Sequence, residues 1–208
     1  MQLSFEKCLH TLLPQLIADP SLHARWLNTL SYMENCGARK IAACEHPTQV
    51  KEEMLKHAAE EFRHAHHLKR QIEKVSPKSL PDYSLHSILG GMKTMHYLEA
   101  LDLHTSRYLS QNVGLSKREV QATAYLLVTF AIEKRAEQLY TLYDAYLRRA
   151  GSKANVKALL LEEKEHLAEM QRNLDALPSG QLHAHHVCLF EEQLYQEWIR
   201  QVAEIFLT

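Results

Sequence analysis

Two Glu-x-x-His motifs are the parts of this 208-residue sequence whose residue types and spacing are most typical of metal chemistry. They are Glu61-Phe62-Arg63-His64 and Glu163-Lys164-Glu165-His166. On a helix, residues three positions apart lie on one face, so the carboxylate and the imidazole of each motif can reach the same ion. Chance alone gives roughly one such motif in a chain of this composition. The motifs therefore need support from their surroundings.

A lone glutamate precedes each motif by about one helix and a turn. Glu34 lies 27 residues before Glu61, and Glu133 lies 30 residues before Glu163. The chain thus repeats one order twice, a single glutamate followed a helical hairpin later by Glu-x-x-His. Chance does not readily give this order. It predicts four helices that contribute to one site in two pairs.

All four glutamates fall where an apolar core residue is expected. The stripes repeat in steps of three and four, as on a helix face buried in a bundle. Their members are Trp26, Leu30, Glu34, Gly37, Ile41 and Cys44; Val50, Met54, His57, Glu61, His64 and Leu68; Ala122, Leu126, Thr129, Glu133, Ala136, Tyr140, Tyr143 and Leu147; and Val156, Leu159, Glu163, Leu167, Met170 and Leu174. Unpaired buried carboxylates cost several kcal/mol and repel one another, so the pattern predicts that cations neutralise them.

The mixture of carboxylates and imidazoles favours first-row transition metals over Mg²⁺ or Ca²⁺. One Glu from each of two helices, with a Glu-x-x-His from each of two others, is an arrangement that holds two iron or manganese ions. We therefore predict two Fe ions, with Mn as an alternative, bound by Glu34, Glu61, His64, Glu133, Glu163 and His166. The small residues Gly37 and Ala136, three positions after each lone glutamate, predict close approach of the helices.

Long helices must position these residues, because only six Gly and six Pro punctuate the chain. The helices that carry the ligands are expected at about Ser21–Cys44, Thr48–Val75, Ser116–Ala150 and Ser152–Leu177. Ser116-Lys117-Arg118-Glu119 is typical of a capping box at a helix start. Gly151 is placed to end the same helix. Pro178 should end the last of the four.

Three further helices are expected around this core. They are a short or bent helix at about Leu3–Ala18 that contains Pro14, an inserted helix at about Leu85–Ser110 weakened by Gly90-Gly91, and a last helix at about Val187–Phe206. The last helix has an apolar side suited to docking on a bundle. The sequence thus predicts an all-α fold in one domain, residues 1–208, with the metal-binding core at about 21–177.

Composition excludes several classes of function. The net charge is −1 with His neutral, so the sequence lacks the basic footprint of a nucleic-acid binder. Cys8, Cys36, Cys44 and Cys188 form no C-x-x-C pair, which argues against a zinc knuckle or a disulfide framework and favours a reduced, cytoplasmic setting. No apolar run of 18 or more residues and no signal-like N-terminus occur, so we expect neither membrane insertion nor export.

The sequence resembles the ferritin-like di-iron carboxylate superfamily over about residues 21–177. The resemblance lies in Glu34, Glu61–His64, Ile132-Glu133-Lys134-Arg135-Ala136 and Glu163–His166. The stretch Phe130–Glu133 and the trailing helix are also similar to the tRNA-hydroxylating MiaE branch. The separation between His64 and Glu133 is longer here than in that branch, which leaves the branch open.

The superfamily resemblance implies a ferritin-like four-helix bundle with an inserted helix between the second and third helices and an extra C-terminal helix. It also implies that two iron ions activate O₂ to oxidise or hydroxylate a small or apolar organic substrate, with electrons from a donor protein, in a monomer or a homodimer. A nucleic-acid partner is expected only for a tRNA hydroxylase. The alternatives are a ferroxidase or iron-handling protein and a helical binding protein that has lost its metal.

Several neighbouring residues have a competing interpretation. Glu60, Glu137 and Glu162 could replace a ligand if a helix were rotated by one position. His57 is expected in the core or beside the ligands, Tyr140 in the core, and Glu165 on the outer face. His66, His67 and a loop at 183–186 are expected to be exposed to solvent, while His96 and Glu99 could approach the site. The plainest alternative places all the glutamates on solvated faces.

Overall fold

The computed structural model describes residues 5–46 and 48–206, and none of these residues forms a strand. The predicted all-α class is therefore confirmed. A π-helical turn, Leu109–Val113, follows α4, and a 3₁₀ turn, Glu204–Phe206, ends the described chain. The helices are α1 (Phe5–Ala18), α2 (Pro20–Ala43), α3 (Glu52–Val75), α4 (Gly91–Tyr108), α5 (Lys117–Arg149), α6 (Lys157–Asp175) and α7 (Gly180–Ala203).

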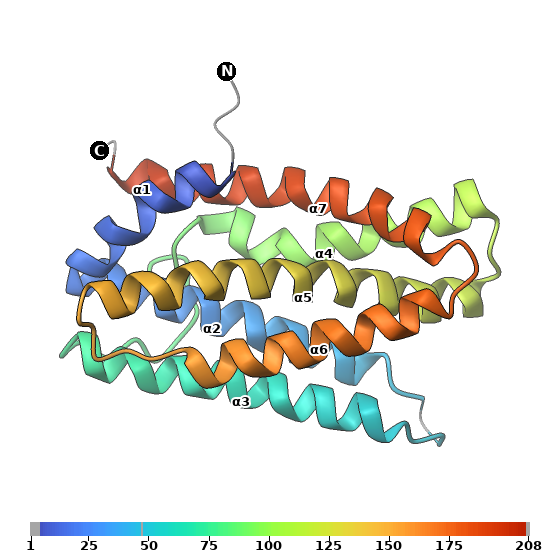
Figure 1. Ribbon diagram of the computed structural model, residues 1–208, viewed down its shortest axis with the longest axis horizontal. Coiled ribbons are helices and arrows are strands. Elements are labelled where there is room, and N and C mark those ends of the chain that lie inside the picture. The colour runs from blue at the N-terminus through green and yellow to red at the C-terminus, as the bar shows by residue number, and fades with distance from the viewer. Residues whose placement is uncertain (1–4, 47, 207–208) are drawn as a thin grey trace.

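Two helical hairpins, α2–α3 and α5–α6, make the most extensive helix–helix contacts. Their axes run along the long dimension of the molecule (Figure 1). Helices α4 and α7 pack on each other and on α5, and α1 packs across α2, α5 and α7. The two hairpins therefore enclose one layer of side chains, while α4 and α7 cover the face of α5 away from α3 (Figure 1).

The ends of α5 agree with the sequence prediction. The Ser116 backbone N–H donates to Glu119 Oε2 at 2.9 Å, as a capping box requires. At the other end, Gly151 has a left-handed φ of 62°, and the Ser152 N–H donates to the Leu147 carbonyl oxygen at 3.0 Å. This bond and that from Gly151 to Arg148 form a Schellman motif. Helix α5 is therefore fixed in length at both ends.

Other helix boundaries differ from the prediction. Helix α2 begins at Pro20, because Asp19 rather than Ser21 is the N-cap and accepts the Ser21 N–H at 2.8 Å. Helices α3 and α4 begin at Glu52 and Gly91, each a few residues after the expected start. Pro47, just before the expected helix start at Thr48, and Leu3, at the expected start of the first helix, lie outside the described residues.

Helix α6 begins at Lys157 rather than Ser152, because Ala154 and Val156 are buried in a non-helical segment before it. Helix α7 begins at Gly180, seven residues before the expected Val187. A Cβ at Gly180 would lie 2.2 Å from the Leu174 carbonyl oxygen, so only glycine allows this tight turn between the two helices. Residues 183–186 are therefore helical and do not form a loop.

The core is apolar on both sides of the layer of polar side chains. Trp26 stacks on Trp198 with ring centroids 5.6 Å apart, which joins α2 to α7. A second cluster, centred on Leu127, joins α4, α5, α6 and α7, and Ile132 packs against both clusters. None of the described helices is long and apolar enough to cross a lipid bilayer.

Candidate metal centre

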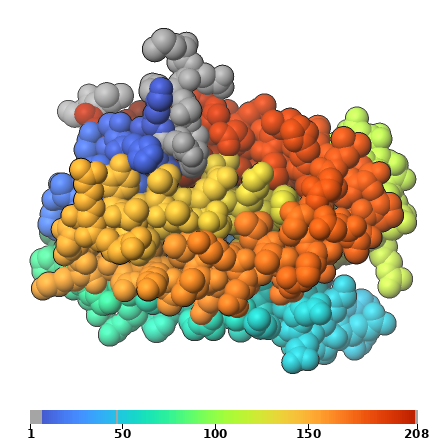
Figure 2. Space-filling model, in the orientation of Figure 1, coloured from blue at the N-terminus to red at the C-terminus, as the bar shows by residue number. Residues whose placement is uncertain are grey.

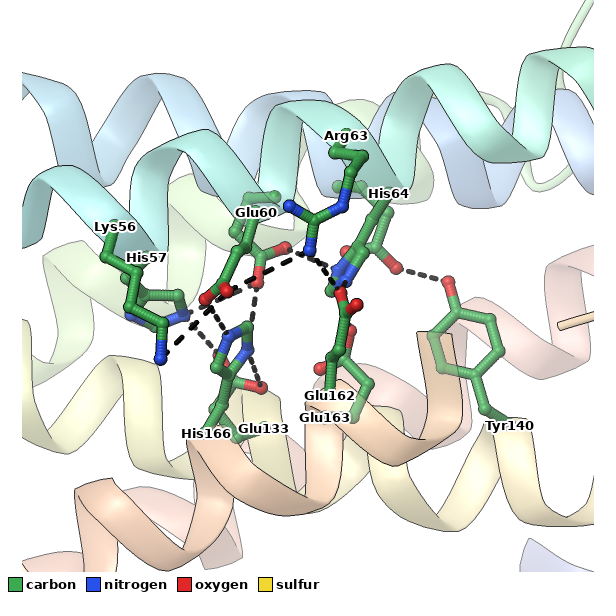
Figure 3. A network of polar contacts seen from close by, with 12 residues as sticks. Lys56, His57, Glu60, Arg63, His64, Glu133, Tyr140, Glu162, Glu163 and His166 are labelled. Carbon is green, nitrogen blue, oxygen red and sulfur yellow. Dashed lines mark hydrogen bonds and ion pairs between the residues drawn. The ribbon is translucent and has the colours of Figure 1, made fainter. Parts of the chain in front are cut away.

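The six predicted ligand residues lie together inside the two hairpins. Glu34 comes from α2, Glu61 and His64 from α3, Glu133 from α5, and Glu163 and His166 from α6. Glu61, His64, Glu133, Glu163 and His166 are each no more than 5% exposed. The side chains of His64, Glu133, Glu163 and His166 converge between the helices (Figure 3). The interpretation that placed the glutamates on solvated faces is therefore wrong.

The donor atoms form two groups that share one carboxylate. Glu34, Glu61, His64 and Glu163 form the first, and Glu61, Glu133 and His166 form the second together with His57. Within each group, one donor atom per residue lies within 4.8 Å of every other. Ligands about 2.1 Å from an ion, on opposite sides of it, are about 4.2 Å apart. The groups are thus close to the size of two metal positions bridged by Glu61.

The inward-facing atoms of this cluster lie close to one another, with His64 Nδ1 2.9 Å from Glu163 Oε1 and His166 Nδ1 3.3 Å from Glu61 Oε1, but none makes a well-aligned hydrogen bond. Of the eight such buried atoms among the described residues, five belong to the cluster: Glu61 Oε1, His64 Nδ1, Glu133 Oε2, Glu163 Oε1 and His166 Nδ1. Buried polar atoms are rarely left in this condition, and each costs about 1–3 kcal/mol. Five in one place make a group that could hold a cation.

The outer nitrogens of the two histidines are hydrogen-bonded, each to the opposite hairpin. His64 Nε2 lies 2.7 Å from Glu162 Oε2, and His166 Nε2 lies 2.9 Å from Glu60 Oε2. Because a carboxylate oxygen accepts, each neutral imidazole carries its proton on Nε2 and directs the Nδ1 lone pair inward. Glu60 and Glu162 therefore orient the ligands and do not replace them. The doublet Glu-Glu-x-x-His, present in both motifs, is the sequence signal for this role.

His57 is buried beside the predicted ligands, as expected, and its ring can also join their donor atoms. Its Nε2 atom is 2.9 Å from Glu133 Oε1 and 3.3 Å from Glu61 Oε1, and the residue is 5% exposed. The spacing His-x-x-x-Glu-x-x-His puts His57, Glu61 and His64 on one face of α3. One group of donors can therefore contain two histidines, His57 and His166, whose ring centroids are 4.3 Å apart.

Tyr140 donates a hydrogen bond from its hydroxyl to Glu34 Oε1, as Figure 3 shows for the tyrosine. The sequence placed Tyr140 in the core, which is confirmed by its exposure of 1%. Its contact with a predicted ligand was not foreseen, because it depends on how α2 and α5 face each other. Glu34 is thereby held at the edge of the cluster nearest Tyr140.

Burial and mutual repulsion raise the pKa values of two of the carboxyl groups well above their ordinary range. For Glu34 the causes are burial and then the charge of Glu61, and for Glu163 they are burial and then the charge of Glu133. Burial also opposes ionisation of Glu61 and Glu133, but contacts with His166 and His57 outweigh it and lower their pKa values. The four carboxylates thus cannot all ionise without compensation.

When no cation is bound, protonated histidines supply the positive charge that compensates the carboxylates. Burial lowers the pKa of each imidazole, but contacts with Glu163 and Glu61 outweigh it and raise the pKa of His64 to about 12. Contacts with Glu133 and Glu61 likewise raise the pKa of His166 to about 11 and that of His57 to about 9. A metal ion bound at Nδ1 must displace these protons, since only the neutral imidazole binds metal.

A cavity of about 110 Å³ adjoins the carboxylates on the side of α2, α4 and α5. Its wall is mainly apolar, and Glu34, Glu61, Glu133 and Glu163 also line it. The apolar wall is formed by residues such as Leu30, Met33, Ile41, Leu98, Val128 and Ile132. An apolar cavity of about 150 Å³ holds benzene. This cavity therefore suits a small apolar molecule in contact with the carboxylates of the cluster.

Gly37 lines this cavity and is not a point of close helix contact, so that expectation is wrong. A Cβ at Gly37 would meet only Glu61 Oε2, at 4.0 Å, which is an ordinary contact. Its missing side chain leaves room in the cavity instead. Ala136 lines the same cavity from α5.

The other expected residues lie away from the centre. Glu165 is exposed, as predicted, and so are His66, His96 and Glu99, which removes the last two as approaching groups. Glu137 contacts Lys164 at 3.9 Å. His67 is half-buried rather than exposed, because its Nε2 atom lies 2.7 Å from the Asn155 carbonyl oxygen. On α7, His183 and His186 contact Tyr108 and His104 of α4.

Comparison with known proteins gave no match, since no family model fits the chain and no curated protein or solved structure is significantly similar to it.

Proposed function

We propose that this chain is a dinuclear metal oxidoreductase of the ferritin-like type, which uses two Fe ions, with Mn as the alternative, to oxidise a small apolar organic molecule with O₂. The observation that carries the proposal is the set of five buried donor atoms that face one another inside the two hairpins, 2.9 Å apart at the closest, without a well-aligned hydrogen bond. Carboxylate and imidazole donors in this proportion suit iron and manganese. The oxygen chemistry itself rests on the resemblance of the sequence motifs.

Each metal position has its own residues under this proposal. Glu34 and His64 would hold one ion, and Glu133 and His166, with His57, would hold the other. Glu61 lies in both groups and would bridge the two ions, with Glu163 beside it. When bound, the ions would supply the binding and one-electron reduction of O₂.

The chain's own residues perform the remaining tasks. Glu60 and Glu162 hold His166 and His64 in the tautomer that binds metal. The apolar cavity lined by α2, α4 and α5 holds the organic molecule and excludes water from the carboxylates. This cavity favours substrate oxidation over iron storage, because storage requires no site for an organic molecule.

Reconstitution with Fe(II) under anaerobic conditions tests the metal centre. We expect close to two ions per chain by elemental analysis, and O₂ uptake by the loaded protein that the metal-free protein lacks. Glu163→Ala or His166→Ala should remove most of the bound metal, while Glu165→Ala, which changes an exposed residue on the same helix, should not. Less than half an equivalent of iron, or equal losses in all three variants, would contradict the proposal.

A further inference from the structure

A histidine on α4 and a histidine on α7 face each other outside the carboxylate cluster. The Nε2 atom of His104 lies 3.3 Å from the Nε2 atom of His186, and the two rings are nearly parallel, with 15° between their planes. Helices α4 and α7 pack on each other, and the first turns of α7 form part of the molecular surface (Figure 2). Neither histidine belongs to the groups formed by the predicted ligands. The pair therefore needs an explanation of its own.

Aromatic rings hold both imidazoles in place. Phe190 stacks on His104 with ring centroids 3.7 Å apart, and Tyr108 stacks on His186 with centroids 4.0 Å apart. The Tyr108 hydroxyl is itself hydrogen-bonded to His183 Nδ1 at 2.8 Å. His104 is half-buried and His186 is exposed. The two Nε2 atoms are thus fixed relative to each other, on a surface that ions can reach.

The distance between the two nitrogens matches that between two ligands of a tetrahedral ion. Zn–N bonds of about 2.0–2.1 Å, at the tetrahedral angle of about 109°, place two nitrogens about 3.3–3.4 Å apart. Neighbouring ligands of a square-planar Cu(II) ion, at about 90° and similar bond lengths, would be only about 2.8–3.0 Å apart. Among the described residues, no carboxylate or thiol joins these two histidines in a group of three donors. The geometry therefore favours Zn(II).

The protonation of the pair also permits metal binding. Burial, and then the charge of His186, lower the pKa of His104 below its ordinary value of 6.5. His104 is therefore neutral at neutral pH, and a neutral imidazole can direct the lone pair of one nitrogen at a metal ion. The predicted ligands His64 and His166 differ, because a metal ion must displace protons from them.

We propose that His104 and His186 bind one Zn(II) ion between α4 and α7, with water in its two other coordination positions, and that the ion joins the two helices. The inference does not depend on the proposed function, since the two sites share no residue. A hydrogen bond between the two imidazoles is the competing explanation. It would place a proton on one Nε2 atom, and 3.3 Å is slightly longer than the usual range of about 2.7–3.2 Å for N–H···O bonds.

Nuclear magnetic resonance locates the bound ion. The metal-free protein, with ¹⁵N-labelled histidines, is titrated with ZnCl₂ at neutral pH. Zinc should shift the Nε2 resonances of His104 and His186, and it should leave those of His185, an exposed neighbour on α7, unchanged. A proton that stays on one of the two Nε2 atoms at saturating zinc would show that the contact is a hydrogen bond only, and would overturn the proposal.

The number of bound zinc ions shows whether the two histidines act together. Because zinc can also enter the carboxylate cluster, the count is compared between variants, by equilibrium dialysis and elemental analysis. His104→Gln and His186→Gln should each bind one ion fewer per chain than the control His185→Gln. The double variant should lose the same single ion, because either substitution breaks the pair. Losses that add up in the double variant would show two independent surface histidines and would contradict a shared ion.

Thermal unfolding tests whether the ion joins the helices. A ligand that binds only the folded state raises its stability, so zinc should raise the melting temperature of His185→Gln by several degrees more than that of His186→Gln. His186 is exposed, and glutamine keeps a hydrogen-bonding group beside His104, so this variant should fold like the unaltered chain without metal. Equal zinc-induced shifts in the two variants would overturn the joining of α4 and α7.

The zinc site and the proposed function fail separately. If zinc shifts the resonances of His104 and His186 but iron does not bind the carboxylate cluster, the proposed function fails and the zinc site stands. If iron binds the cluster but His186→Gln and His185→Gln bind equal amounts of zinc, the zinc site is wrong and the proposed function remains.

Discussion

His166 on α6 and Glu60 on α3 are joined by a hydrogen bond of 2.9 Å, and the reciprocal bond joins His64 on α3 to Glu162 on α6 at 2.7 Å. Each hairpin therefore orients a histidine that is a predicted ligand on the other hairpin. Arg63 holds Glu162 from outside, at 2.6 Å, and so supports one of these bonds.

Removing one of these outer carboxylates should weaken metal binding without removing a ligand. We expect Glu60→Ala and Glu162→Ala to raise the dissociation constant for Fe(II) or Mn(II) by about 10- to 100-fold, because the imidazole loses its fixed orientation. Competition with a chromophoric chelator measures the constant, and Glu165→Ala is the control. Affinities indistinguishable from that of the control would show that the two hydrogen bonds do not strengthen metal binding.

Acid should stabilise the metal-free protein before it denatures it. The raised pKa values of Glu34 and Glu163 mean that the folded state holds protons which the unfolded state releases, so stability increases as pH falls from neutral towards their ordinary value of 4.5. His23 opposes this below its ordinary value of 6.5, because its pKa in the fold is about 4. The stabilising effect of protonating the two carboxyl groups outweighs the opposite effect of the one imidazole. The melting temperature of the metal-free protein should therefore still rise as pH falls.

Below about pH 4.5, further acid should lower the stability of the metal-free protein. The lowered pKa values of Glu61 and Glu133 contribute stability that is lost as pH falls through them. In the metal-loaded protein, protons compete with the metal for the same atoms, so mild acid should only lower the melting temperature. Scanning calorimetry of both forms checks the prediction, and parallel pH profiles would contradict it.

Gly37 offers a way to fill the cavity while leaving the metal ligands intact. Gly37→Ala should stabilise the protein by about 0.5–1 kcal/mol, since alanine is favoured in a helix and the added Cβ meets only Glu61 Oε2 at 4.0 Å. Gly37→Leu should occupy the cavity, and so abolish benzene binding in calorimetric titration while iron binding persists. Undiminished benzene binding by Gly37→Leu would show that small molecules enter elsewhere.

The buried pair of Arg135 and Glu191 should be the ionic contact with the largest effect on stability. Arg135 Nη2 donates to Glu191 Oε2 at 2.7 Å and its Nε donates to Oε1 at 2.9 Å, while Tyr97 also donates to this carboxylate. Glu191→Ala should lower the free energy of unfolding by about 3–5 kcal/mol, because the buried charge of Arg135 loses the carboxylate of Glu191. The expected loss is at the lower end, since Glu192 still contacts Arg135.

Urea denaturation measures this loss. The double variant Arg135→Met/Glu191→Leu should recover most of it, because replacing both charges with apolar groups removes the cost of burying them. A double variant no more stable than Glu191→Ala would show that the hydrogen bonds, not the burial of charge, dominate.

The sequence predicted which side chains cluster better than it predicted the contacts around them, because the positions of the predicted ligands follow a helical period. Glu34 and Glu61 stand out as charges in apolar stripes, and periodicity alone places them inward. His57 follows the same stripe, but the stripe cannot distinguish a donor from a core residue. The hydrogen bond from Tyr140 to Glu34 depends on how two helices face each other, which no single stripe records.

The start of α7 was missed for a different reason. Pro178 and Gly180 signal a break, and the polar residues His183–His186 are typical of a loop. The turn is nevertheless tight because Ser179 adopts a left-handed φ of 56° and Gly180 has no Cβ. Tertiary contacts of His183 and His186 with α4 then stabilise the first turns of the helix.

The reciprocal bonds between the hairpins also set the order of events during synthesis. The residues they join are 98 and 106 positions apart in the chain, so neither bond can form until α6 has left the ribosome. Contacts between such distant residues form late in folding, after local helices. A nascent chain that ends at α5 carries four of the six predicted ligands, Glu34, Glu61, His64 and Glu133, and neither of the two hydrogen bonds. Under the proposed function, metal would therefore be loaded after translation, into a chain that has already docked its two halves.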